Sequence, residues 1–117
     1  MSMRSLLFLC AAAALMAQNA GLTEALSSSR QRIDSIDDQI VALLNQRARV
    51  VREVGLIKKQ YHAPVSAPGR EQQVLRRVAG LAQAPLTPPA VEAIYKTVLQ
   101  EMSSMEASEV EHDSKPQ

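Results

Sequence analysis

The chain has 117 residues, a formal net charge of +1 and 3% aromatic residues. A general nucleic-acid binder needs a broad basic surface and often rings that stack on bases, so we expect no nucleic-acid partner. The single cysteine, Cys10, leaves no pair for a disulfide. The two histidines, His62 and His112, lie far apart beside a loop and in a polar tail, which argues against a histidine metal centre.

The first twenty residues have the pattern of an export signal. Arg4 precedes an apolar run from Leu6 to Met16, and small residues follow from Ala17 to Ala20. The run is shorter than a membrane-spanning helix requires. We therefore expect residues 1–20 to be a signal peptide whose removal leaves an exported, periplasmic or secreted protein with no membrane attachment. The alternative is a buried N-terminal helix.

Residues 21–107 have the pattern of one all-α domain with three helices, one long and two shorter. From Thr23 to Tyr61 there is no proline and a single glycine, and apolar residues recur at helical spacing, which predicts an unusually long helix. Two prolines and a glycine between residues 62 and 69 then predict an ordered turn, and Pro68 suits the first turn of the next helix. That second helix is expected from Arg70 to Leu81, with Val74, Leu75, Val78 and Leu81 on one side.

A third helix is expected after the cap formed by Thr87 and the two prolines that follow it. After Ala107 the composition becomes polar, and residues 108–117 are expected to form a disordered tail. The apolar residues of this helix recur at helical spacing: Val91, Ile94, Tyr95, Val98, Leu99, Met102 and Met105.

The long helix carries more apolar surface than two short helices can cover. A helix of about 35 residues is roughly 50 Å long, which exceeds the width of a compact domain of this size. A second copy of the chain would cover the stripe, so we expect an intertwined helical homodimer. The alternative, an elongated monomer, would expose a large apolar patch, which is rare on soluble monomers.

Cations interrupt the apolar stripe of the long helix. Arg47 falls in the same heptad column as Ile40 and Val54, where an unpaired buried charge would cost several kcal/mol, so it needs an anionic partner. Lys58 follows three turns later, roughly 16 Å away along the same face. Arg30 is about 25 Å from Arg47 by the same rise, so only an antiparallel partner helix could bring an Arg30 to this site.

The other two helices add charged residues to their apolar faces. Arg70 and Glu71 lie in the first turn of the second helix, and Glu106 lies four residues after Met102 on the third. A single inward charge is often half of a structural ion pair, but several converging cations predict a small ligand with more than one carboxylate. Five other arginines are expected on solvated faces: Arg32, Arg49, Arg52, Arg76 and Arg77.

Several loose motifs occur in a fixed order between about Ala25 and Ala107. The order is specific even though each motif alone is not. The motifs are Arg30-x-x-Ile33-x-x-Ile36-Asp37, Leu43-Leu44-x-x-Arg47, Val54-Gly55-x-x-Lys58, Pro64-Val65, Arg70-Glu71 leading to Val74-Leu75, Val91-x-x-Ile94-Tyr95, and Met102 to Glu106.

Together these motifs resemble the all-helical, AroQ-class chorismate mutases, here of an exported type. The resemblance implies an intertwined dimer with two active sites that rearranges chorismate to prephenate without metal or organic cofactor. It implies that Arg30 crosses to the partner's site and that Arg47 and Arg70 bind carboxylates. It also implies that Lys58 contacts the ether oxygen and that Glu71 accepts the substrate hydroxyl.

Three positions depart from the family pattern. Ala67 stands where some members have an aspartate near the hydroxyl, and Met102 stands where some have a serine that helps bind a carboxylate. Glu106 stands where many have a glutamine. An ionised glutamate would repel a developing oxyanion, so we expect Glu106 to work in its protonated form and activity to be higher on the acid side of neutral.

Two other functions remain open from the sequence. An isochorismate pyruvate lyase has a similar fold and pocket, and its loop can resemble the segment from Ser66 to Arg70. A non-catalytic secreted protein could also dimerise through the long helix. That function would not explain why Arg47, Lys58 and Arg70 lie on apolar faces.

Overall fold

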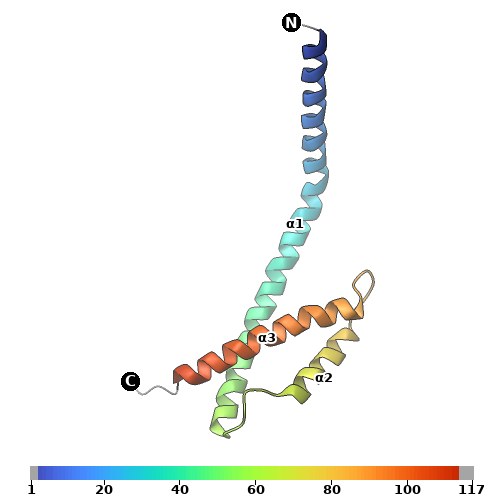
Figure 1. The fold of residues 1–117 in the computed structure, drawn as a ribbon. Coiled ribbons are helices and arrows are strands. Elements are labelled where there is room, and N and C mark those ends of the chain that lie inside the picture. Colours follow the sequence, from blue (N-terminus) through green and yellow to red (C-terminus); the bar gives the residue numbers. More distant parts are fainter. Residues whose placement is uncertain (1–2, 114–117) are drawn as a thin grey trace. The chain divides into compact units, whose positions relative to one another are not determined.

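The computed structural model describes residues 3–113, which form three α-helices and no strand (Figure 1). They are α1 (Met3–Gln60), α2 (Pro68–Ala79) and α3 (Pro88–Asp113). The prediction of an all-α fold with one long and two shorter helices is therefore confirmed. The chain divides into two compact units, Met1–Leu43 and Leu44–Gln117.

In the first unit, helix α1 begins at Met3 and so includes the segment expected to be a signal peptide. Its N-terminal part is long and apolar enough to cross a membrane by length and composition, and none of that part is buried. A signal peptide near the N-terminus has the same length and composition, so the assignment of this segment as an export signal stays a prediction. The segment is exposed on the single chain, which disfavours the alternative of a buried N-terminal helix.

In the second unit, α1 ends where His62 adopts a left-handed backbone conformation with φ of 54°. The N–H groups of Tyr61 and Ala63 donate to the carbonyls of Ile57 and Lys58 at 3.1 and 2.8 Å, which satisfies carbonyls in the last turn of the helix. Pro64 follows, and the chain turns back toward α2. This turn brings the backbone of Val65 next to the end of α1, where it becomes part of the site described below.

Helices α2 and α3 pack against each other around a small apolar core. Pro68 occupies the first turn of α2, as predicted, and Gly80 ends the helix by donating to the Arg76 carbonyl at 3.3 Å. Because α2 stops at Ala79, Leu81 lies in the following turn and is 66% exposed, so its assignment to the buried face is wrong. The core contains Val74, Val78 and Val91, with Ala82, Tyr95 and Leu99 packed against them.

Helix α3 begins as expected and ends later than expected. The Thr87 hydroxyl accepts a hydrogen bond from the Ala90 N–H at 3.3 Å and so caps the first turn. The helix continues to Asp113, although a disordered tail was expected from Ser108. Within these added residues Glu109 pairs with Arg52 of α1 at 3.3 Å. Residues 114–117 lie outside the described part of the chain.

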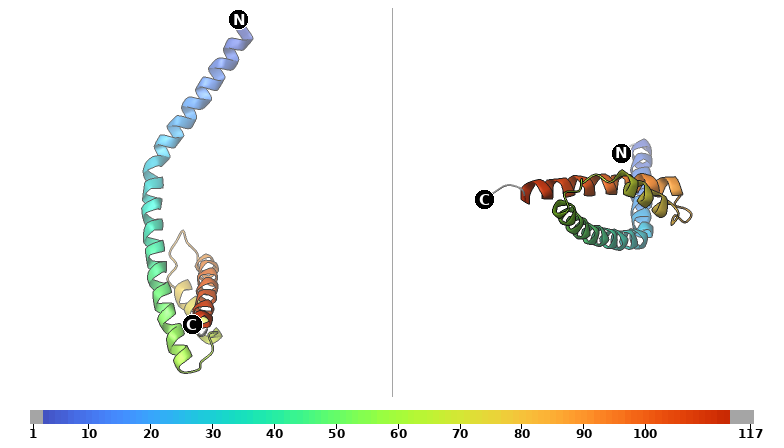
Figure 2. Two further views of the ribbon diagram at one scale, coloured as in Figure 1. Left: turned by 90° about the vertical axis from the view of Figure 1, so that its left-hand side faces the viewer. Right: turned by 90° about the horizontal axis from the view of Figure 1, so that it is seen from below.

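Figure 2 shows α2 and α3 beside the C-terminal, green part of α1. The heptad columns of α1 that were expected to form a core are exposed on the single chain. The exposed fraction is 49% for Ile40 and 62% for Leu43. The other exposed members of these columns are Ile33, Ile36, Val50, Val54 and Ile57.

Candidate functional site

A cavity of about 470 Å³ lies in the second unit, between the C-terminal part of α1, the turn after it, α2 and α3. This size is within the range of about 300–1,000 Å³ that is usual for small-molecule sites. Valines of α1 and Tyr95, Leu99 and Met102 of α3 form much of its apolar wall. Its polar and charged lining residues are Arg47, Lys58, Arg70, Glu71, Arg77, Ser103 and Glu106.

The cavity brings together five of the six residues selected from the sequence. Arg47 and Lys58 face it from α1, Arg70 and Glu71 from the first turn of α2, and Glu106 from α3. The sixth, Arg30, is an exposed residue of the first unit, and its place in the partner's site stays a prediction.

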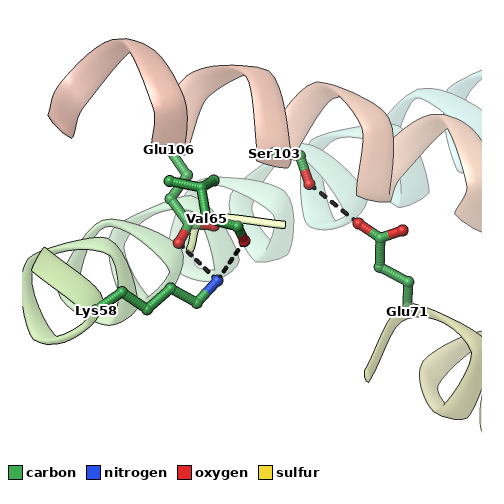
Figure 3. Close-up of polar contacts among 5 residues, drawn as sticks. All are labelled: Lys58, Val65, Glu71, Ser103 and Glu106. Atoms are coloured by element: carbon green, nitrogen blue, oxygen red, sulfur yellow. Dashed lines mark hydrogen bonds and ion pairs between the residues drawn. The ribbon is translucent and has the colours of Figure 1, made fainter. Parts of the chain in front are cut away.

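Lys58 and Glu106, which both line the cavity, form a largely buried ion pair (Figure 3). The Lys58 ammonium lies 2.9 Å from Glu106 Oε1 and donates a 2.7 Å hydrogen bond to the Val65 carbonyl. The Glu106 side chain is 7% exposed and that of Lys58 is 21% exposed. The approach to Oε1 is not aligned as a hydrogen bond, so this buried oxygen is held by charge and retains a free lone pair.

Gly55 is what allows α3 to approach α1 closely at this ion pair. It is the one buried residue in the described part of α1. A Cβ atom at this position would lie 3.0 Å from Glu106 Cγ and 3.7 Å from a methyl group of Val110. A larger side chain would therefore push Glu106 away from Lys58.

Glu71 is held at a second polar contact of the cavity. The Ser103 hydroxyl donates to Glu71 Oε1 at 3.3 Å, and this contact joins α3 to the first turn of α2 (Figure 3). The Arg70 guanidinium does not pair with the adjacent Glu71 carboxylate. It donates instead to Gln73 Oε1 at 2.7 Å. Ala67, which has no polar side-chain atom, lines the cavity just before α2.

Two lining residues were missed by the sequence analysis. Arg77 is exposed, as expected for its solvated face, but it also lines the cavity. Its position in the lining could have been predicted from the spacing, because Arg77 lies seven residues after Arg70 and three after Val74 on the same helix. Ser103 could have been found in the same way, since it lies three residues before Glu106. The other four arginines assigned to solvated faces do not line the cavity.

The cavity carries an excess of positive charge. Four cationic side chains face two carboxylates, and one of those carboxylates is already paired with Lys58. Among the residues that the structure describes, neither Arg47 nor Arg77 has a hydrogen bond or ion pair from its side chain. No group of three or more metal-binding side chains lies together in the described part of the chain. The arrangement suits a small dianion whose carboxylates would bind the unpaired guanidinium groups.

The sequence is similar to that of known chorismate mutase domains. Residues 29–107 match the family described as chorismate mutase type II. The chain is 35% identical over 85 residues to a bifunctional chorismate mutase/prephenate dehydratase of Neisseria gonorrhoeae, covering 73% of this chain and 23% of that protein. It is 32% identical over 62 residues to a chorismate mutase of Methanocaldococcus jannaschii, covering 53% of this chain and 63% of that protein.

Solved structures share the fold at lower identity. The Helicobacter pylori chorismate mutase, solved in complex with prephenate, has a TM-score of 0.69 and 24% identity, covering 75% of this chain and 96% of that one. A chorismate mutase of Thermus thermophilus has a TM-score of 0.68 and 22% identity, covering 70% and 93%. Since the family match covers more than half of its residues, the chain belongs to the chorismate mutase type II family.

Proposed function

We propose that this protein is a chorismate mutase that rearranges chorismate to prephenate. The observation that carries the proposal is the cavity with two unpaired arginines and an excess of positive charge, in a chain of this family. Chorismate carries two carboxylates, and its charge complements the cavity. The relatives support this reaction by name, although the chain spans only 16–23% of two bifunctional relatives and 63% of the Methanocaldococcus jannaschii protein.

The reaction is an intramolecular pericyclic rearrangement, in which one C–O bond breaks as one C–C bond forms. It needs no nucleophile, so the residues act by holding the reactive conformation and by stabilising charge on the ether oxygen. Arg47 and Arg70 bind the carboxylates, and Glu71 accepts the substrate hydroxyl. Lys58 and Glu106 lie together in the lining of the cavity, where they would contact the ether oxygen.

The pairing of Lys58 with Glu106 gives Glu106 a defined part in this step. An ionised Glu106 carboxylate neutralises the Lys58 ammonium that would contact the ether oxygen. A proton on Glu106 would release Lys58 from this pair and would also convert Glu106 into a hydrogen-bond donor. Both changes favour the developing oxyanion.

The active form is proposed to be a homodimer in which Arg30 completes the partner's site. The exposed apolar columns of α1 support this proposal, because a second copy of α1 would cover them.

Export through residues 1–20 is proposed from the basic residue, apolar run and small residues at the N-terminus. In a bacterial host that expresses the full chain, we expect the protein in the periplasmic fraction, with an intact mass that lacks about the first 20 residues. Retention of the full-length mass in the membrane fraction would show instead that the segment is an anchor.

Wild-type protein is expected to consume chorismate and release prephenate, as followed by absorbance and chromatography. Arg47→Ala should lower kcat/KM about a hundredfold or more, because a substrate carboxylate would lose its guanidinium partner. Arg49→Ala is the matched control, since Arg49 is exposed and does not line the cavity. Turnover of isochorismate to pyruvate and salicylate without turnover of chorismate would favour the lyase, and inactivity on both would favour the non-catalytic dimer.

Mixing two inactive variants tests the crossing arginine. Arg30→Ala and Arg47→Ala should each be nearly inactive, but a mixed dimer of the two has one site with both arginines intact. After equimolar unfolding and refolding together, random pairing should restore about a quarter of wild-type activity. Recovery should be absent if Arg30 serves its own chain, and Arg30→Ala alone should remain active if Arg30 has no part in the reaction.

Glu106→Gln tests whether a hydrogen-bond donor at this position assists the reaction. The glutamine amide can donate and does not neutralise Lys58, so kcat/KM of the variant should exceed that of the wild type at neutral pH. Glu109→Gln, at the ion pair with exposed Arg52, should retain the wild-type kcat/KM. A kcat/KM of Glu106→Gln below that of the wild type would contradict the idea.

A further inference from the structure

Glu71 takes its orientation from α3. Its carboxylate accepts a hydrogen bond from the Ser103 hydroxyl at 3.3 Å, across 32 residues of sequence. Among the described residues, this is the one hydrogen bond or ion pair made by the Glu71 side chain. Arg70, which precedes it, is engaged by Gln73 instead.

Nothing on the α2 side replaces this contact. The residue before α2 is Ala67, and the helix has no side-chain hydrogen bond at its N-terminal cap. A glutamate has several freely rotating bonds, so fixing one of its rotamers carries an entropic cost that a single partner can reduce. Both Glu71 and Ser103 are partly buried and line the cavity, so the hydrogen bond forms where a ligand would lie.

We propose that Ser103 is a positioning residue for Glu71, an inference that rests on the proposed chorismate mutase function. A serine hydroxyl has one proton, which here goes to Glu71 Oε1. The other carboxylate oxygen, Oε2, then keeps its lone pairs for the substrate hydroxyl. Ser103 therefore sets which oxygen of Glu71 is presented to the substrate and prevents the side chain from turning away.

Ser103→Ala removes the donor and should lower kcat/KM for chorismate about tenfold, as expected for one hydrogen bond to a charged group. Ser103→Thr keeps a hydroxyl and should restore activity to within about twofold of the wild type. Ser104→Ala is the matched control, because Ser104 is the exposed neighbour on α3 and does not line the cavity. Wild-type activity in Ser103→Ala would overturn the proposal.

A double-mutant cycle separates positioning from direct contact with substrate. In a Glu71→Gln background, Ser103→Ala should cost less than about twofold, because the carboxylate through which Ser103 acts has already been removed. An undiminished tenfold loss in that background would overturn the proposal and make Ser103 a substrate ligand. Thermal unfolding of each variant, measured in parallel, should give midpoints like that of the Ser104→Ala control. Inactivity of the wild type on chorismate would count against the proposed function itself, whereas an active wild type with an unaffected Ser103→Ala would count against Ser103 alone.

Discussion

Glu106 is a carboxylate with a side chain that is 7% exposed, and its charge is matched by the Lys58 ammonium 2.9 Å away. Removing one member of a buried ion pair leaves an uncompensated charge and typically costs about 3–5 kcal/mol, so α1 and α3 are constrained to cross where these two residues meet. Gly55 makes that crossing possible, because any larger side chain would occupy the space of Glu106 Cγ. The crossing in turn sets the width of the cavity, since Arg47 and the valines on its wall lie on the same face of α1.

The same contact limits what the cavity can bind. With Lys58 engaged by Glu106 and by the Val65 carbonyl, the unpaired positive charge in the described part of the cavity resides on arginines. Guanidinium groups bind planar carboxylates through two parallel hydrogen bonds, which fixes the orientation of a ligand as well as its charge. A ligand with two carboxylates would therefore be held in one orientation within the cavity that Lys58 and Glu106 also line. An intramolecular rearrangement is favoured when its substrate is held in one reactive conformation.

Features that depend on residue spacing within one helix could be predicted from the sequence. Arg47 and Lys58 face the same cavity because eleven residues make about three turns, and the same rule placed Arg70 and Glu106 on apolar faces. It would also have placed Arg77 beside Arg70, had it been applied to that residue. Spacing cannot show which residues meet across two helices, so neither the bond from Ser103 to Glu71 nor the role of the Val65 carbonyl could be predicted. The late end of α3 was missed because the polar composition after Ala107 does not show that Glu109 meets Arg52 of α1.

Helix α3 carries one partner of each polar contact in the cavity, the Ser103–Glu71 hydrogen bond and the Lys58–Glu106 ion pair. Ser103 and Glu106 are three residues apart, so they lie on one face within about one turn. A rotation or slide of α3 would thus disturb the hydrogen bond to Glu71 and the ion pair with Lys58 at the same time. The helix is fixed near its start by Val91 in the core with α2, and toward its other end by the close approach at Gly55. Changes at either of these packing points, although they touch no substrate, should therefore alter recognition of the hydroxyl and stabilisation of the ether oxygen together.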